Sequence, residues 1–370
     1  MIYLDNGATT LHKAPGVYEA VNWGLRHCGN PGRGGYPVAM EASNVVFRCR
    51  ERAGRLFHCS PEQVVFTTNC THGLNIAIRT LLKPGDKVVI SGFEHNAVTR
   101  PLHHLGCEIL VAGNCLFSWT NTLEAFEQAL KQKPKAAVFT HVSNVFGYVL
   151  PIKEMAGLCK KYGVPFIIDA AQSAGSQPLN LEELGAAFIA MPGHKGLLGP
   201  MGTGLLLCTQ LPEPLLQGGT GSQSYDQQMP EFLPDRAEAG TLNLPGICGL
   251  SAALKYMEGQ NLDKIMERET QQVGSTAMGL GDLGATVFFG PHQGGTISFL
   301  PPKGDCETVT EKLASRGICL RAGLHCAPLA HESAGTLNTG TIRVSFGPDA
   351  SPRQTKALLE ACRGVFREVR

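Results

Sequence analysis

The chain has 370 residues, and its 32 lysines and arginines nearly balance its 31 aspartates and glutamates. A chain of this length exceeds the size at which one hydrophobic core usually stops growing, so we expect a large domain with a smaller one packed against it. The balanced charge gives no electrostatic basis for nucleic acid or an anionic membrane as the main partner. A small, roughly neutral or zwitterionic substrate fits this composition better.

The N-terminal stretch MIYLDNGATT has no basic region leading into an apolar one. No apolar run along the chain approaches the roughly 18 residues that a membrane span needs. We therefore expect a soluble, cytoplasmic protein that does not enter a membrane.

The thirteen cysteines are odd in number and scattered without CxxC pairs. In a chain of this length the pattern favours reduced thiols over a disulfide framework. Most of them are expected to be buried and to behave as small apolar residues. Neither cysteines nor histidines have the short spacing of a structural zinc site, so no metal site is predicted.

Apolar runs of strand length alternate with amphipathic, helix-like segments through most of the sequence. This alternation predicts βαβ units and a mostly parallel sheet with both faces covered, so the fold class is α/β. The runs lie at residues 63–68, 87–92, 135–142, 165–170, 186–191 and 202–208, with helix-like segments at 123–132 and 152–163.

The pattern changes between residues 217 and 245, which are rich in Gly, Gln, Pro and Ser. A linker is one reading, and a functional loop is the other. The chain then continues with a helix-like segment at 246–260 and short strand-like runs at 294–302, 317–323 and 340–347. We expect a large domain over residues 16–249 and a smaller α/β domain formed by residues 1–15 and 250–370.

Three features of the sequence can carry chemistry. Asp169 ends the run PFIID, which places its carboxylate at the carboxyl end of a parallel strand, although a helix cap is an equally common role for such a residue. Lys195 lies in the Gly- and Pro-rich stretch MPGHKGLLGPMGTG, where desolvation could free its amine for Schiff-base chemistry; a plain surface lysine is the alternative.

The third feature is the segment VVFTTNCTHGLNIAIRTLL, which predicts a strand followed by an amphipathic helix. Amides at the helix start and the hydroxyl of Thr71 would suit a phosphate, although helix capping explains the same residues. A phosphate anchor, a reactive lysine and a strand-end aspartate are the three parts that a pyridoxal phosphate enzyme needs.

On these motifs the chain resembles the cysteine desulfurase group of the class V aminotransferase family, within the fold-type I pyridoxal phosphate enzymes. The resemblance implies that family's fold, with a mostly parallel sheet in a large domain and a smaller C-terminal α/β domain. The motifs that carry it follow the family's order over nearly the whole chain: YLDNGATT (3–10), NPGRGG (30–35), EHNA (94–97), HVSNVFG (141–147), DAAQSAG (169–175), PGHKGLLGP (192–200), EAGTLN (238–243), RAGLHCAP (321–328) and TIRVSFG (341–347).

The resemblance implies a set of residues that bind pyridoxal 5'-phosphate. Lys195 would attach the cofactor covalently, and Asp169 would pair with its pyridinium nitrogen. His95 would stack on the ring and move protons, and Gln172 would hydrogen-bond the ring oxygen. The other cofactor-binding residues would be Cys70, Thr71, His194 and, from the second subunit of a homodimer, Thr241.

The resemblance also implies a substrate site and a nucleophile. Arg343 and Asn144 would hold the carboxylate of L-cysteine, with Arg321 as a further substrate-binding residue. Cys326 would attack the substrate sulfur, release alanine and keep a persulfide for an acceptor, which could be a protein. Since the attack needs a thiolate, nearby positive charge would help, and Arg321 and His325 are the candidates.

Several points depart from the family pattern or stay open. Pro192, His72 and Gly7 stand where many members have a hydroxyl residue, Glu and Ala respectively. The substrate could instead be that of a selenocysteine lyase, a cysteine sulfinate lyase or an aminotransferase. An inactive sulfur-transfer scaffold is the non-enzymatic alternative. Whether the segment after Cys326 forms a long mobile loop is also open, because Pro328 argues only against a central strand.

Overall fold

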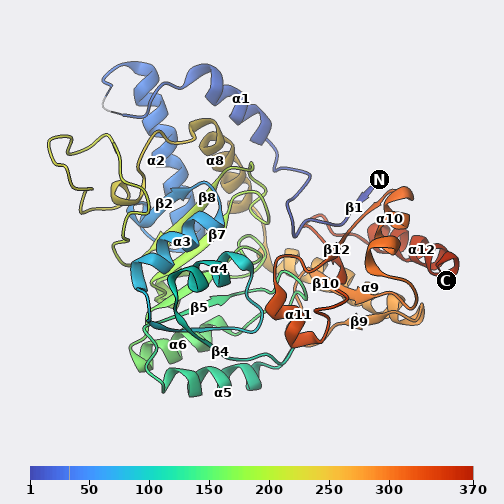
Figure 1. Ribbon diagram of the computed structural model, residues 1–370. Coiled ribbons are helices and arrows are strands. Elements are labelled where there is room, and N and C mark those ends of the chain that lie inside the picture. The colour runs from blue at the N-terminus through green and yellow to red at the C-terminus, as the bar shows by residue number, and fades with distance from the viewer. Residues whose placement is uncertain (33, 370) are drawn as a thin grey trace.

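A sheet of seven strands forms the centre of the larger part of the chain in the computed structural model, which describes residues 1–32 and 34–369 (Figure 1). Its strand order is β2-β8-β7-β6-β5-β3-β4, and all neighbours are parallel except the pairs that β8 makes. The prediction of a mostly parallel sheet is therefore confirmed. The strands are β2 (Val64–Thr67), β3 (Lys87–Ile90), β4 (Glu108–Val111), β5 (Ala136–Thr140), β6 (Phe166–Asp169), β7 (Phe188–Pro192) and β8 (Gly204–Cys208).

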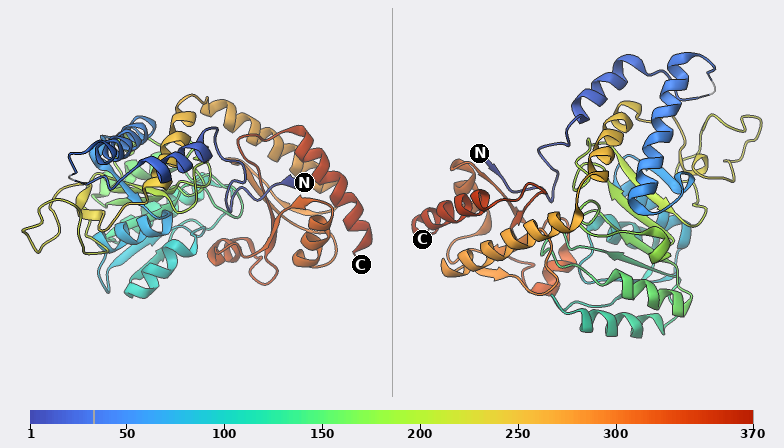
Figure 2. Two further views of the ribbon diagram at one scale, coloured as in Figure 1. Left: turned by 90° about the horizontal axis from the view of Figure 1, so that it is seen from above. Right: turned by 180° about the vertical axis from the view of Figure 1, so that it is seen from behind.

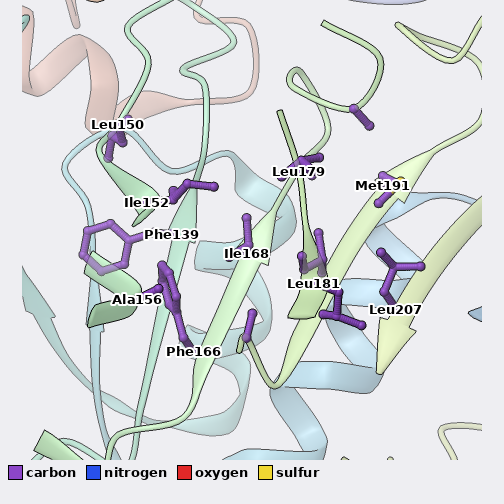
Figure 3. Close-up of a cluster of buried hydrophobic side chains, with 14 of the residues drawn as sticks. Phe139, Leu150, Ile152, Ala156, Phe166, Ile168, Leu179, Leu181, Met191 and Leu207 are labelled. Atoms are coloured by element: carbon purple, nitrogen blue, oxygen red, sulfur yellow. The ribbon is translucent and has the colours of Figure 1, made fainter. Parts of the chain in front are cut away.

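Helices cover both faces of this sheet, because alternate side chains of each strand point to opposite faces. In β8, Leu205 and Leu207 join one buried cluster, whereas Leu206 and Cys208 join the other. Helices α2, α5, α6 and α8 contribute to the first cluster, part of which Figure 3 shows, and α3 and α4 contribute to the second. The helices of this part are α1 (Val17–His27), α2 (Pro37–Phe57), α3 (Cys70–Leu81), α4 (Asn96–Leu105), α5 (Trp119–Leu130), α6 (Ile152–Tyr162), α7 (Leu181–Leu184) and α8 (Leu244–Glu258).

The C-terminal part has its own antiparallel sheet, in the order β12-β13-β10-β9, and its own buried cluster. The start of the chain belongs beside it, because β1 (Ile2–Tyr3) pairs with β11 (Ile318–Cys319). The other elements are α9 (Leu262–Asp282), β9 (Thr286–Phe288), β10 (Thr296–Leu300), α10 (Cys306–Ser315), β12 (Arg321–Gly323), α11 (Pro328–Ala334), β13 (Thr341–Ser345) and α12 (Pro352–Glu368).

The expected domain boundary at residue 250 falls inside α8. This helix packs against α1 and α2 of the larger part, and the C-terminal part begins with α9. We propose that the division lies between α8 and α9. The motif NPGRGG includes residue 33, which lies outside the described residues.

None of the helices in the described part of the chain has the length and apolar character that a bilayer span requires.

The segment between β8 and α8 is fixed to the sheet by a buried ion pair. Arg50 Nη2 lies 2.6 Å from Glu238 Oε2, and the two side chains are 7% and 6% exposed. The second carboxylate oxygen, Oε1, accepts a hydrogen bond from the backbone amide of Phe66 at 2.6 Å. A loop held in this way is part of the fold and is not a free linker.

We expect the substitution Glu238→Gln to lower the free energy of unfolding by ~3–5 kcal/mol, because it leaves the Arg50 guanidinium buried without its counter-charge. Glu213→Gln is the matched control, since Glu213 is 58% exposed in its pair with Arg236 and should cost under ~1 kcal/mol. Urea unfolding of both variants measures the difference. Equal, small losses would show that the buried pair does not hold this loop.

Candidate active site

The candidate residues gather at the carboxyl ends of the parallel strands. Asp169 is the last residue of β6, and Lys195 follows the end of β7. Helix α3 begins at Cys70, shortly after β2 ends. Open α/β sheets bind ligands at this edge, so the topology alone brings these distant segments together.

Asp169 is 2% exposed and has one carboxylate oxygen already engaged. Oδ1 accepts hydrogen bonds from Cys70 Sγ at 3.3 Å and from the amide of Ala171 at 2.9 Å. Burial, and then the charge of Asp169, raise the pKa of Cys70 well above its usual value, so this thiol stays protonated as a donor. Within the described residues Oδ2 has no hydrogen-bond partner, and it can accept from a ligand.

Two lysines at the site have pKa values below their usual range. Burial, and then the positive charge of Arg343, lower the pKa of Lys195, whose amine has no hydrogen-bond acceptor among the described residues. Burial also lowers the pKa of Lys13, but its Nζ donates to the carbonyl of Thr10 at 2.8 Å and to that of His194 at 3.3 Å. These acceptors stabilise the ammonium form of Lys13, so Lys195 is the better nucleophile.

The start of α3 offers unpaired donors. The side chain of Asn69 caps the helix by accepting from the amide of His72, which leaves the amides of Cys70 and Thr71 without an acceptor among the described residues. His72, a departure from the family pattern, has a local role here, since its Nδ1 lies 3.3 Å from the amide of Thr68. The first turn of α3 can therefore bind an anion.

Residues near the N-terminus complete this side of the site. His194 Nδ1 lies 3.0 Å from Thr9 Oγ1, and burial, and then Lys195, lower the pKa of His194 to about 4. Gln172 donates through Nε2 to the carbonyl of Gly7 at 2.9 Å. Sterics explain why position 7 is glycine and not alanine, because a Cβ there would lie 2.7 Å from Ser345 Oγ.

Arg343 is buried and held on two sides. Its Nη2 lies 2.6 Å from Asp5 Oδ1, and its Nη1 donates to the carbonyl of Asn144 at 3.0 Å. Nε is buried without an acceptor among the described residues. Arg321 lies directly across from Arg343 in the pairing of β12 with β13. A substrate carboxylate would thus share this guanidinium with Asp5, whose role the sequence did not single out.

Cys326 is one of two exposed cysteines; the other is Cys115. Seven of the thirteen cysteines are buried, which confirms the expectation that most of them are. Burial raises the pKa of Cys49 and of Cys159 to about 12. These thiols are inert at neutral pH, so Cys326 stands out by exposure.

A tight turn between β12 and α11 presents Cys326. His325 and Cys326 have φ values of 49° and 57°, in the left-handed region that non-glycine residues rarely adopt. The turn is held to the larger part by two hydrogen bonds: the amide of Asn96 donates to the Cys326 carbonyl at 2.7 Å, and Asn144 Nδ2 donates to the His325 carbonyl at 2.7 Å. Asn96 and Asn144 of the larger part therefore hold the backbone of the turn that carries the thiol.

Cys326 and His95 line one cavity of about 390 Å³, together with Thr71. His95 Nδ1 accepts from the amide of Ala97 at 3.0 Å, so the neutral ring carries its proton on Nε2. Burial is the main cause that lowers the pKa of His95. A neutral imidazole with a free Nε2–H can move a proton beside the thiol.

The suggestion that His325 supplies positive charge to Cys326 is wrong. The ring of His325 is buried, with Nε2 3.1 Å from the carbonyl of Thr341, and burial, and then Arg343, lower its pKa to about 3. The ring is neutral at physiological pH. The segment after Cys326 is also no long loop, because Pro328 starts the helix α11, a position that suits proline.

Thr241 does not lie with the other candidate residues in the single chain. It is exposed and lines a separate cavity of about 510 Å³, which Arg50 and Glu238 also line. The cavity that Lys195 and Gln172 line does not include it.

The chain is similar over nearly its whole length to proteins of one family. The family model described as aminotransferase class-V matches residues 2–358. A probable cysteine desulfurase of Methanothermobacter thermautotrophicus is 31% identical over 93% of this chain and 90% of its own length, and one of Pyrococcus abyssi is 31% identical over 100% and 94%. The apo structure of a cysteine desulfurase from Thermococcus onnurineus NA1, 30% identical, matches with a TM-score of 0.91 over 100% of this chain and 95% of that one.

Proposed function

Because this chain belongs to the aminotransferase class-V family, we propose that it is a pyridoxal phosphate-dependent cysteine desulfurase, which converts L-cysteine to L-alanine and keeps the sulfur as a persulfide on Cys326. One observation carries the proposal. The exposed thiol of Cys326 shares a cavity with His95, whose pKa is lowered mainly by burial and is also shifted by the charges of Asp169 and Lys195. This arrangement supports a single site that combines the nucleophile, the proton carrier, the lysine and the carboxylate.

The residues present fit pyridoxal 5'-phosphate. The free Oδ2 of Asp169 can pair with a protonated ring nitrogen, and the unpaired amine of Lys195 can bind the aldehyde carbon. The open amides at the start of α3, with the hydroxyl of Thr71, suit the phosphate. When bound, the cofactor would act as an electron sink that stabilises negative charge at the substrate Cα.

The chain's own groups then have separate tasks. Arg343 binds the substrate carboxylate, and Lys195 and His95 carry protons between the substrate carbons. The Sγ of Cys326 attacks the sulfur of L-cysteine, so that a sulfur–sulfur bond forms while the carbon–sulfur bond breaks. The three-carbon product takes up a proton at Cβ and leaves as alanine. No external oxidant or reductant is needed.

A homodimer is part of the proposal. Helices α1 and α2, at the outer edge of the larger part in Figure 2, expose apolar side chains that a subunit interface would bury. In such a dimer Thr241 would reach the phosphate site of the partner subunit. The free thiols fit a reducing compartment such as the cytoplasm. The exposed apolar residues of the two helices are Tyr18, Trp23, Leu25, Val38, Met40 and Phe47.

Mass spectrometry tests the proposed function. After incubation of the cofactor-loaded protein with L-cysteine, we expect the peptide that contains Cys326 to gain one sulfur atom and alanine to appear. The peptide that contains Cys115, the other exposed cysteine, is the internal control and should stay unmodified. Alanine formation without added sulfur on Cys326, or equal modification of both peptides, would contradict the assignment.

A further inference from the structure

Two arginines lie at the cavity of Cys326 and have no part in the proposed chemistry. Arg79 comes from α3 and Arg100 from α4, helices that pack side by side against the same face of the large sheet (Figure 1). His104, one turn after Arg100, lines the cavity as well. No aspartate or glutamate is among the described residues that line this cavity, so its wall is basic.

Within one chain, neither guanidinium is paired with a carboxylate of the described residues; Arg79 is half-buried and Arg100 is exposed. Within the described residues, Arg79 and Arg100 form no ion pair, and Nε of Arg79 is buried without an acceptor. Besides burial, which is the main cause, Arg100 is among the positive charges that lower the pKa of His95, which places it within electrostatic reach of the reacting groups. Unpaired arginine donors in a concave site favour an anionic ligand.

The carboxylate of L-cysteine does not account for these charges, because Arg343 and Asn144, which are proposed to bind it, do not line this cavity. Building on the proposed function, we propose that Arg79 and Arg100 bind a small anionic thiol, which takes the persulfide sulfur from Cys326. The two arginines then serve the transfer of the persulfide sulfur to the acceptor and not the cleavage of L-cysteine.

The geometry favours a small acceptor that enters the cavity. The hydrogen bonds from Asn96 and Asn144 hold the backbone of the Cys326 turn against the larger part. The acceptor therefore approaches the thiol within the cavity. A volume of about 390 Å³ falls in the range of roughly 300–1,000 Å³ that small-molecule sites have. Carboxylate groups on the acceptor would face the guanidinium groups while its sulfur approaches Cys326.

The transfer step balances without any further reagent. The acceptor thiolate attacks the outer sulfur of the Cys326 persulfide, and a new sulfur–sulfur bond forms on the acceptor. The bond between the outer sulfur and Cys326 Sγ breaks, and Cys326 leaves as a thiolate. The acceptor becomes a persulfide, and the enzyme returns to its starting state.

Alkylation of Cys326 tests the charge of the cavity independently of desulfurase activity. We expect the ratio of the reaction rates with iodoacetate and with iodoacetamide to be at least about 10-fold higher in the wild type than in the variant Arg79→Gln/Arg100→Gln. The rates are followed on the peptide that contains Cys326, with Cys115 as the internal control. The ratio in the wild type should fall as the ionic strength rises. An unchanged ratio would overturn the inference.

Persulfide transfer tests the acceptor itself. After persulfide has been quantified on Cys326, its discharge is measured with mercaptosuccinate, 2-mercaptoethanol and cysteamine, and each rate is divided by the concentration of thiolate. Mercaptosuccinate should react at least about 10-fold faster than cysteamine in the wild type, and the double Gln variant should lose this preference. The double Lys variant should keep it, because the charge remains.

Controls separate this inference from the proposed function. The variant Arg353→Gln/Arg363→Gln removes the same net charge from exposed positions on α12 and should behave as the wild type. Absence of any persulfide on Cys326 would refute the proposed function, while the alkylation ratio would still decide whether the cavity attracts anions. Equal discharge by all three thiols would refute the anionic acceptor.

Discussion

Replacing Cys326 by serine is expected to lower L-cysteine-dependent alanine formation by ~10³-fold or more, as the loss of a catalytic nucleophile commonly does. Serine has nearly the same size, so the turn between β12 and α11 and its hydrogen bonds from Asn96 and Asn144 should persist. The hydroxyl cannot accept sulfur at neutral pH. Alanine release, measured with enzyme loaded with pyridoxal phosphate, gives the result.

Two comparisons make the Cys326 result specific. Cys115→Ser removes the only other exposed thiol among the described residues and should leave alanine formation within about twofold of the wild type, since surface changes usually have small effects. The visible absorption of the bound cofactor should be the same in the wild type and in both variants. If Cys326→Ser turned L-cysteine over at the wild-type rate, the sulfur would have another acceptor and the assignment of the nucleophile would be wrong.

Most of the large sheet could be predicted because its strands are buried on both faces and therefore appear as apolar runs. The exception is β4, whose residues Glu108–Val111 are exposed or only partly buried at the edge of the sheet. An edge strand needs no long apolar run, and no other feature of the sequence predicted β4. The sequence places the domain boundary at residue 250, inside α8, whereas we propose a boundary after α8. The packing of α8 on α1 and α2 is a long-range contact that no local sequence pattern predicts.

The candidate site could be assembled from the sequence where strand ends fix the position of a side chain, as for Asp169 and Lys195. Side-chain orientation could not be predicted in the same way. Whether His325 faces the solvent or the carbonyl of Thr341 depends on the pairing of β12 with β13. The ion pair between Asp5 and Arg343 likewise requires the N-terminus to lie beside the C-terminal sheet.

Substitution of Lys195 by alanine is expected to abolish covalent attachment of the cofactor and to lower L-cysteine turnover by at least about 10²–10⁴-fold, the usual contribution of a proton-transfer group. The physical reason is the low pKa of this amine, caused by burial and then by Arg343. A lower pKa leaves a larger fraction of the amine neutral at physiological pH, and only the neutral form is nucleophilic. Borohydride treatment followed by peptide mass spectrometry locates the attached cofactor.

Lys13 provides the sharpest comparison, because its pKa is also lowered by burial and it lies beside His194. If a low pKa alone selected the attachment site, the two lysines would compete. The acceptors around Lys13 Nζ, the carbonyl groups of Thr10 and His194, stabilise its ammonium form, whereas the Lys195 amine has no such partner among the described residues. We therefore expect Lys13→Ala to keep the cofactor on Lys195. Attachment of the reduced cofactor to Lys13 in the Lys195→Ala variant would show that the hydrogen bonds of Lys13 do not prevent it from reacting.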